Sequence, residues 1–276
     1  MSTRRPELGK WLLYKWFYRD SELRATLPPT RPLTKTHINT FLQQYQSIYI
    51  KPVAGSRGKN VMRVYNQKNG THGLHRENKI PLTFSQLSVL HQTIDRLTQG
   101  RKWIVQKDIH LSTIHSRPYD IRVMMQKDKN EKWQCTGICA KVAGPHSAVT
   151  NIAQSKGRVI SVAEALKESH HYNTLQSNVV IKQLQHLSFT ACNRLEAYQR
   201  YSEIGLDVGI DQQGKLWILE ENTGPSHALF AHMSNKRPYQ RIQRVARERR
   251  FARSKKRAYQ SRRTPAFQRS AKSSSL

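Results

Sequence analysis

Residues 218–222 read Ile-Leu-Glu-Glu-Asn, and this stretch decides the fold of the 276-residue chain. An apolar run from Gly205 to Ile210 and a glycine-containing turn precede it, so the sequence predicts a β-hairpin. The hairpin places Asp207 beside Glu220. Glu220 and Asn222 leave one face of their strand because side chains alternate with a period of two. Two carboxylates and an amide oxygen on one face suit Mg²⁺. The alternative is a polar edge hairpin with solvated acids.

A glycine-containing loop between two strands is the second informative feature. A β-rich run that carries Lys51 precedes Gly55, Ser56 and Gly58, and a second run follows at residues 60–65. It is not a Walker loop, because the required glycine-lysine pattern and the following helix are missing. Backbone N–H groups near the glycines can turn toward an anion, with Lys51 as a point charge. An ordinary hairpin whose loop needs glycine is the alternative.

Two further segments complete a series. Residues 103–109 form an apolar run that breaks into polar residues, which is typical of a strand end or of a hinge that reads an adenine edge. Residues 117–125 begin another strand with Asp120 and Arg122 on one face, and residues 133–142 are its expected antiparallel partner.

Taken in order, these segments resemble the ATP-grasp superfamily, most closely the YheC/YheD family of endospore-forming bacteria and more distantly RimK-type amino-acid ligases. The resemblance covers Glu7 to Phe230 and rests on the order of the motifs. A lysine precedes a glycine loop, and a hinge, an acidic-x-Arg strand, an asparagine, an Asp and a Glu-x-Asn follow. It implies an α+β ATP-grasp fold, with two α+β lobes and the nucleotide between them.

The resemblance also implies nucleotide-binding residues, namely Lys51, Gly55, Ser56, Gly58, Gln106, Lys107, Ile109 and Asp120. Lys51 is similar to the lysine that contacts the α- and β-phosphates, and Gly55 to Gly58 resemble the loop that covers them. Gln106 stands where many ATP-grasp proteins carry a glutamate facing the adenine amino group. The carbonyl of Lys107 and the N–H of Ile109 would complete adenine recognition, and Asp120 resembles the acid near the ribose.

The implied catalytic residues are Arg122 and Lys141, which resemble the basic groups facing the γ-phosphate and the acyl-phosphate. RimK-type enzymes carry arginine at the position of Lys141, so bidentate recognition is lost there. Asp207, Glu220 and Asn222 resemble the metal ligands.

The activity that the resemblance implies is Mg²⁺-dependent ATP binding, with ligation of an unknown carboxylate to an unknown amine or thiol through an acyl-phosphate. Association with the spore coat is implied as well. Two rivals remain: a non-catalytic coat-assembly protein that keeps the fold, and a polyanion- or nucleic-acid-binding protein.

Charge is concentrated at the C-terminus. The formal net charge is +29, and residues 236–276 hold fifteen Lys or Arg but only one acid, Glu248. Residues 241–257 are compatible with a basic helix, but no apolar stripe looks large enough to pack, so we expect a disordered tail. Such a tail fits a polyanion or an acidic coat partner. The alternative is a solubilising tail without a particular partner.

The expected domains are a lead segment at 1–35, an ATP-grasp domain at 36–235 and the basic tail at 236–276. Within the domain we expect a small lobe at about 36–110 and a large lobe at about 111–235. The short lead segment predicts that a full N-terminal pre-ATP-grasp domain is missing. Helices are expected at residues 6–18, 34–46, 84–98, 162–169 and 178–201.

Nothing in the sequence predicts a membrane span, because no apolar run approaches eighteen residues. No signal peptide is expected either. Cys135, Cys139 and Cys192 fit no paired framework, and Cys135 and Cys139 are expected on one face of a strand. Buried reduced thiols suit the cytosol, so we expect a cytoplasmic protein.

Overall fold

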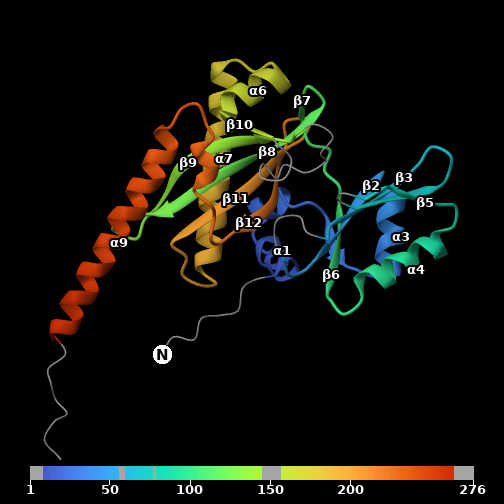
Figure 1. Cartoon of the computed structure of the whole chain (residues 1–276), viewed down its shortest axis with the longest axis horizontal. Helices are drawn as coiled ribbons and strands as arrows, with labels where there is room; N and C mark the ends of the chain where they lie inside the picture. Colours follow the sequence, from blue (N-terminus) through green and yellow to red (C-terminus); the bar gives the residue numbers. More distant parts are fainter. Residues whose placement is uncertain (1–8, 56–59, 77–78, 145–156, 264–276) are drawn as a thin grey trace, which may run out of the picture.

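A computed structural model describes residues 9–55, 60–76, 79–144 and 157–263, with side chains up to Lys255. Two α+β lobes lie side by side, each built on an antiparallel sheet (Figure 1). Ser56 and Gly58 of the predicted phosphate loop lie outside the described residues.

The small lobe has the strand order β1-β6-β2-β3-β4-β5. Its strands are β1 (Thr30–Pro32), β2 (Ser47–Pro52), β3 (Met62–Asn66), β4 (His72–Arg76), β5 (Leu82–Phe84) and β6 (Trp103–Lys107). Helices α3 (Lys35–Gln44) and α4 (Leu87–Thr98) pack on this sheet. Ile38 and Phe41 of α3 are buried because they lie three residues apart on one helical face. Ile94 of α4 is buried in the same core, so two amphipathic helices close the lobe.

The large lobe has the strand order β10-β9-β8-β11-β12, with β7 paired to β8. Its strands are β7 (Thr113–Ile114), β8 (Arg117–Lys127), β9 (Trp133–Val142), β10 (Arg158–Ile160), β11 (Glu203–Ile210) and β12 (Leu216–Asn222). Helices α6 (Val162–His170) and α7 (Thr174–Glu196) pack on one face of the sheet. A reciprocal capping box between Asn173 and Gln176 begins α7. Leu184 is buried in the core beneath.

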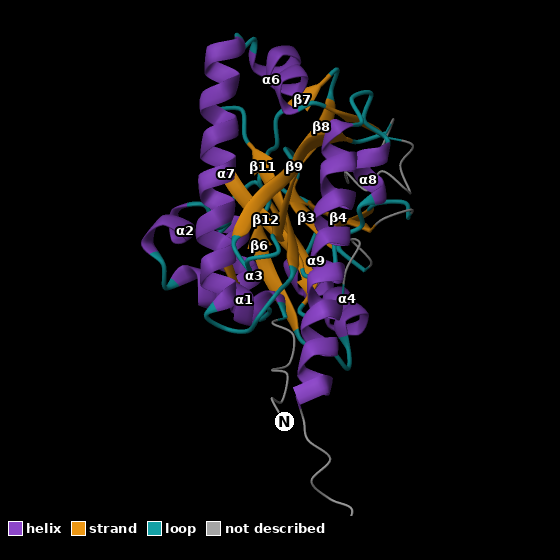
Figure 2. Cartoon of the chain, turned by 90° about the vertical axis from the view of Figure 1, so that its left-hand side faces the viewer, coloured by secondary structure: helices purple, strands orange, loops and turns teal. Residues whose placement is uncertain are grey.

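Two helices cover part of the opposite face. Figure 2 shows the strands of the large lobe between α7 on one side and α8 and α9 on the other. These helices are α8 (Ala228–Ala231) and α9 (Arg237–Arg263). Phe230 and Ile242 are fully buried against this face. A Cβ atom at Gly137 would lie 2.9 Å from each of these two side chains, so glycine permits the close approach.

Helix α1 (Lys10–Tyr18) lies between the lobes and is followed by α2 (Ser21–Ala25) (Figure 1). The backbone N–H of Lys10 donates to the carbonyl of Val53 in the small lobe at 2.9 Å. At the other end of α1, the indole N–H of Trp16 donates to the carbonyl of Arg194 on α7 at 2.8 Å. Helix α1 therefore connects the end of the small-lobe sheet to the large lobe.

The predicted hairpin is confirmed. It consists of β11 and β12, and Asp207 is paired with Glu220. The five expected helices also form. Their bounds differ from the prediction by a few residues, most at the two ends of α7.

The expectation that Cys135 and Cys139 share a face is wrong. Met124 pairs with Gly137 but Met125 pairs with Cys135, so Thr136 is an extra residue in β9. This β-bulge reverses the alternation of side chains. Cys135 consequently packs in the core beside α7, whereas Cys139 packs beside α9. The three thiols are free, and burial raises the pKa of Cys135 to about 11.

The structure also differs from the disordered tail expected after residue 235. Residues 237–263 form α9, and Ile242 and Val245 are buried, 0% and 4% exposed. The apolar stripe is narrow, but it meets a face of the sheet that Phe230 and Met233 also cover. No helix in the described part of the chain combines the length and apolar character needed to cross a bilayer.

Replacing Ile242 by Ala tests whether α9 belongs to the fold. The substitution removes a fully buried side chain, so it should lower the free energy of unfolding by about 2–5 kcal/mol. Urea denaturation measures this loss. Phe251, which is 63% exposed on the same helix, is the matched control, and Phe251→Ala should change stability by less than about 0.5 kcal/mol. Equal stability of the two variants would show that α9 does not pack.

Candidate functional site

Four charged side chains form a buried cluster on the face of the large sheet opposite α7. Arg122 of β8 donates from Nε and Nη2 to the two carboxylate oxygens of Asp207 at 2.5 and 2.9 Å. Lys141 of β9 lies 2.8 Å from Asp120 and 3.1 Å from Asp207. Antiparallel pairing explains the cluster, because Arg122 lies opposite Asp207 and Lys141 lies opposite Asp120. We call these four residues the ionic cluster.

The ionic cluster contains two acids and two bases, and none of its side chains is more than 12% exposed. Burial alone would favour the neutral form of Asp207. The ammonium of Lys141 and the guanidinium of Arg122 outweigh this effect and hold the pKa of Asp207 well below its usual range. Burial likewise opposes the charge of Lys141, and the carboxylates of Asp120 and Asp207 raise its pKa. Asp207, Lys141 and Arg122 are thus charged at neutral pH.

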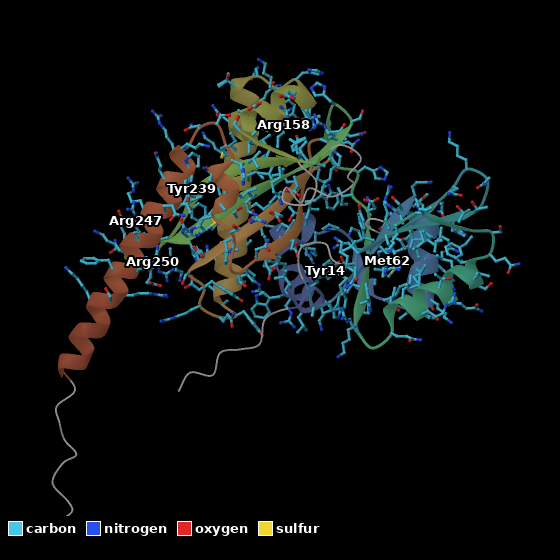
Figure 3. The ribbon with its side chains drawn as sticks, in the orientation of Figure 1. Tyr14, Met62, Arg158, Tyr239, Arg247 and Arg250 are labelled. Carbon is cyan, nitrogen blue, oxygen red and sulfur yellow. The ribbon has the colours of Figure 1, made fainter. Side chains whose placement is uncertain are left out.

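A cavity of about 390 Å³ lies between the lobes beside this cluster. Five of the predicted site residues line it, namely Lys51, Gly55, Gln106, Glu220 and Asn222. They come from the small-lobe strands β2 and β6, from the start of the glycine loop and from β12 of the large lobe. Helix α1 forms another wall with Lys10 and Tyr14, and Tyr14 is labelled between the lobes in Figure 3.

Lys51 is a partly buried cation that lines the cavity. Its Nζ donates to Oε1 of Gln106 at 2.7 Å and lies 5.2 Å from the ring centre of Tyr49. Burial lowers the pKa of Lys51 to about 8. The carboxylate of Glu220 opposes this shift and the ammonium of Lys10 adds to it. The hydrogen-bond partner of Lys51 is a neutral amide, so its charge remains available to an anion.

Lys10 was not found by sequence analysis. Its Nζ donates to the carbonyl of Gly55 at 2.5 Å and lies 3.4 Å from Glu220 Oε1. In the sequence, Lys10 is noticeable only because it stands at the start of an aromatic-rich helix. This position does not predict that its side chain contacts both lobes. Gly55 has a φ of 122°, which favours glycine at this turn.

Asn222 connects the cavity to the ionic cluster. Its Nδ2 lies 3.5 Å from Asp207 Oδ2, whereas Glu220 contacts Lys10. The three predicted metal ligands therefore supply two carboxylates and an amide on neighbouring strands. Both carboxylates already have cationic neighbours: Lys10 lies against Glu220, and Arg122 and Lys141 lie against Asp207. Hard oxygen donors that attract a cation fit Mg²⁺. Among the described residues, no group of three or more His, Cys, Asp or Glu is arranged to hold a metal, so this set depends on the amide.

The hinge residues do not all face this cavity. Gln106 does, and its Nε2 donates to Thr30 Oγ1 at 2.9 Å. Lys107 and Ile109 line a second cavity of about 310 Å³. There the ammonium of Lys107 lies 5.6 Å from the ring centre of Trp217. The two sides of the hinge thus face different cavities.

Comparisons with known proteins give a consistent result. A sequence model of the family described as YheC/D like ATP-grasp matches residues 3–249. Endospore coat-associated protein YheD of Bacillus subtilis (strain 168) is 26% identical over 231 residues, which are 81% of this chain and 49% of YheD. Endospore coat-associated protein YheC of the same organism is 22% identical over 233 residues, 82% of this chain and 62% of YheC. The chain thus spans about half to three-fifths of these relatives.

Solved structures share the fold. The ATP-grasp ligase PsnB, complexed with a phosphomimetic variant of its minimal precursor, Mg and ADP, matches with a TM-score of 0.53 at 11% identity. The match covers 88% of this chain and 58% of PsnB. PsnB with minimal precursor alone matches with a TM-score of 0.52 at 12% identity, over 87% and 61% of the two chains. The likeness confirms the predicted α+β ATP-grasp fold.

Asp207→Asn tests the ionic cluster. The amide removes one of two negative charges and leaves Arg122 and Lys141 under-compensated in a buried place, so we expect a loss of about 3–5 kcal/mol in the free energy of unfolding. Asn222→Ala, whose contact with Asp207 is long, should cost about 1 kcal/mol or less. Denaturant unfolding without nucleotide measures both. If Asp207→Asn lowers the free energy of unfolding by less than Asn222→Ala does, Asp207 has no structural role.

Proposed function

The chain belongs to the YheC/D-like ATP-grasp family, and from this premise we propose that the cavity between its lobes binds ATP with Mg²⁺. The observation that carries the proposal is the meeting of Lys51, Gln106, Glu220 and Asn222 around one cavity although they come from two different sheets. A simple edge hairpin with solvated acids would not require this convergence.

In the proposed complex, Lys51 binds the phosphates. Its ammonium is partly buried and hydrogen-bonded to a neutral amide, so an incoming phosphate oxygen would form a charge-assisted hydrogen bond with it. Gly55 begins the loop that covers the phosphates. Gln106 would face the adenine amino group from within the cavity. The backbone carbonyl of Lys107 and the N–H of Ile109 would complete adenine recognition from the adjoining hinge, although these two residues line the second cavity.

Asp207, Glu220 and Asn222 would hold Mg²⁺. A bound Mg²⁺ would neutralise negative charge on the phosphates. The chemistry of these donors supports the assignment. Glu220 is half-buried and already attracts the ammonium of Lys10, so a cation is favoured at this place before any nucleotide arrives.

We further propose that the protein is a carboxylate–amine or carboxylate–thiol ligase. Arg122 and Lys141 would stabilise the negative charge on the transferred phosphoryl group and on the acyl-phosphate, with Asp120 near the ribose. The ATP-grasp ligase PsnB, solved with Mg and ADP, supports this class of chemistry. The names of YheD and YheC support association with the endospore coat.

A non-catalytic coat-assembly protein is the rival. A structural protein has no need of a lysine that faces an open cavity with only a neutral amide as its hydrogen-bond partner, so the position of Lys51 favours the enzyme. Screening amino acids and peptides with Mg-ATP for ADP release tests ligation. Release above the rate without acceptor supports the ligase, and nucleotide binding without release from any acceptor supports the rival.

Lys51→Met tests phosphate recognition. Loss of the ammonium should weaken ADP binding about tenfold to a hundredfold, which corresponds to a charge-assisted hydrogen bond, and leave adenosine binding unchanged. Titration calorimetry with both ligands measures the difference. Lys79→Met removes an exposed lysine elsewhere on the small lobe and should alter neither affinity. Equal losses for ADP and adenosine would mean that the substitution damages the lobe.

The lowered pKa of Lys51 predicts a pH dependence. In the free protein Lys51 is charged below about pH 8 and loses its proton above it. A bound phosphate favours the ammonium, so ADP affinity should fall as the pH rises above about 8, by up to about tenfold per pH unit. Calorimetry between about pH 7 and about pH 9.5 measures the slope. Lys51→Met should abolish the slope, and an unchanged slope in this variant would assign the titration to another group.

A further inference from the structure

Helix α9 is fixed to the large lobe along one face. Ile242 and Val245 are buried against the sheet. One turn further on, Arg249 is 6% exposed and donates from Nη1 to the carbonyl of Ser202 at 2.7 Å. Its Nη2 lies 3.0 Å from both carboxylate oxygens of Glu131 in the β8–β9 turn. Arg249 is thus an anchor, and it holds the rest of α9 in a defined place relative to the body.

The remaining surface of α9 is cationic. Its exposed basic residues up to residue 255 are Arg237, Arg241, Arg244, Arg247, Arg250, Arg253 and Lys255. The same part of the helix has a single acid, Glu248, which lies 3.9 Å from Arg244. Figure 3 shows Arg247 and Arg250 on α9 beside the end of the large-lobe sheet. We call the exposed basic residues of α9 the arginine surface.

An anionic membrane is a poor fit for the arginine surface. An interfacial helix needs an apolar face that enters the lipid. The buried apolar residues of α9 face the protein, and Phe251, whose ring lies 4.8 Å from the ammonium of Lys255, is the one large apolar side chain exposed on it up to residue 255. A single aromatic ring does not make a membrane-binding face.

A phosphate polymer fits better. Six of the seven exposed cations are arginines, whose planar fork matches phosphate oxygens in a bidentate way. The exposed cations span residues 237–255, roughly 27 Å of helix, and duplex DNA presents one charge per roughly 1.7 Å of its axis, so several contacts can form in parallel. The β8–β9 turn that Arg249 contacts also carries the exposed Lys129 and Lys132.

We propose that the arginine surface of α9 is a binding site for the phosphodiester backbone of nucleic acid. The site lies on the sheet face covered by α8 and α9, and it does not use the residues that line the cavity between the lobes. The basic side chains of α9 would recognise the charge of the phosphodiester backbone. This recognition requires no other hydrogen-bond donor or acceptor on the helix. The proposal is independent of nucleotide binding.

Fluorescence anisotropy tests it over a series of salt concentrations. The labelled ligands are a DNA duplex, a single-stranded RNA, inorganic polyphosphate and polyglutamate. The test variant replaces Arg237, Arg241, Arg244 and Arg247 by Gln in the full chain. The control variant replaces Lys68, Arg96, Arg101 and Lys102 by Gln, which removes the same charge from exposed positions of the small lobe.

The wild type and the control should bind duplex DNA with an affinity that falls steeply with salt. The test variant should bind at least tenfold more weakly, and its slope of log K against log salt should be smaller by about 0.9 for each phosphate that the variant no longer neutralises. An equal loss of DNA affinity in both variants would mean that only the net charge of the protein matters, and it would overturn the proposed site. Tighter binding to polyphosphate or to polyglutamate than to either nucleic acid would overturn it in favour of another acidic polymer or of an acidic protein. Unfolding curves confirm that both variants fold.

Discussion

Asp207 carries a buried negative charge that two cations neutralise, and the large lobe is organised around this requirement. The guanidinium of Arg122 and the ammonium of Lys141 reach it from two different strands. A slip of either strand by one residue would turn its cation toward the apolar face beneath α7 and leave the carboxylate unpaired. The ionic cluster therefore selects one register for β8, β9 and β11. It also keeps Asp207 beside Asn222, so the same interaction that specifies the sheet places the end of β12 at the cavity.

Charge is distributed differently on the two sides of the site. The ionic cluster is neutral as a whole, but Lys51 of the small lobe pairs with the amide of Gln106 instead of a carboxylate. A glutamate at position 106 would neutralise Lys51 in the empty protein and would compete with a phosphate for it. Glutamine leaves the ammonium underpaired, which is consistent with the lowered pKa. Lys10 reaches the cavity from α1, so a third element holds part of the charge that a nucleotide would meet.

Sequence analysis predicted the features that depend on local periodicity. The hairpin that carries Asp207 and Glu220 follows from alternation and a turn, and the residue order carried the resemblance to the family. It missed features that depend on distant contacts. The bulge at Thr136 separates the two cysteines of β9, and no residue type in that strand announces it. The narrow stripe around Ile242 looked too small to pack, because the sheet face that receives it is built from strands about 80 to 120 residues earlier in the chain. Lys10 was missed for the same reason.

Buried and exposed cations of this chain respond differently to salt. The arginine surface is solvated, and interactions between exposed charges are screened beyond about 10 Å at 0.1 M salt. Lys51 lies in a cavity bounded by protein on both lobes, where screening is weaker. Salt also screens Arg249 weakly, because its side chain is buried and its guanidinium contacts Glu131 and the carbonyl of Ser202. From composition alone, the basic residues near the C-terminus all look equally available to a polyanion. Burial separates the arginine that holds the helix in place from those that remain free to meet a polyanion.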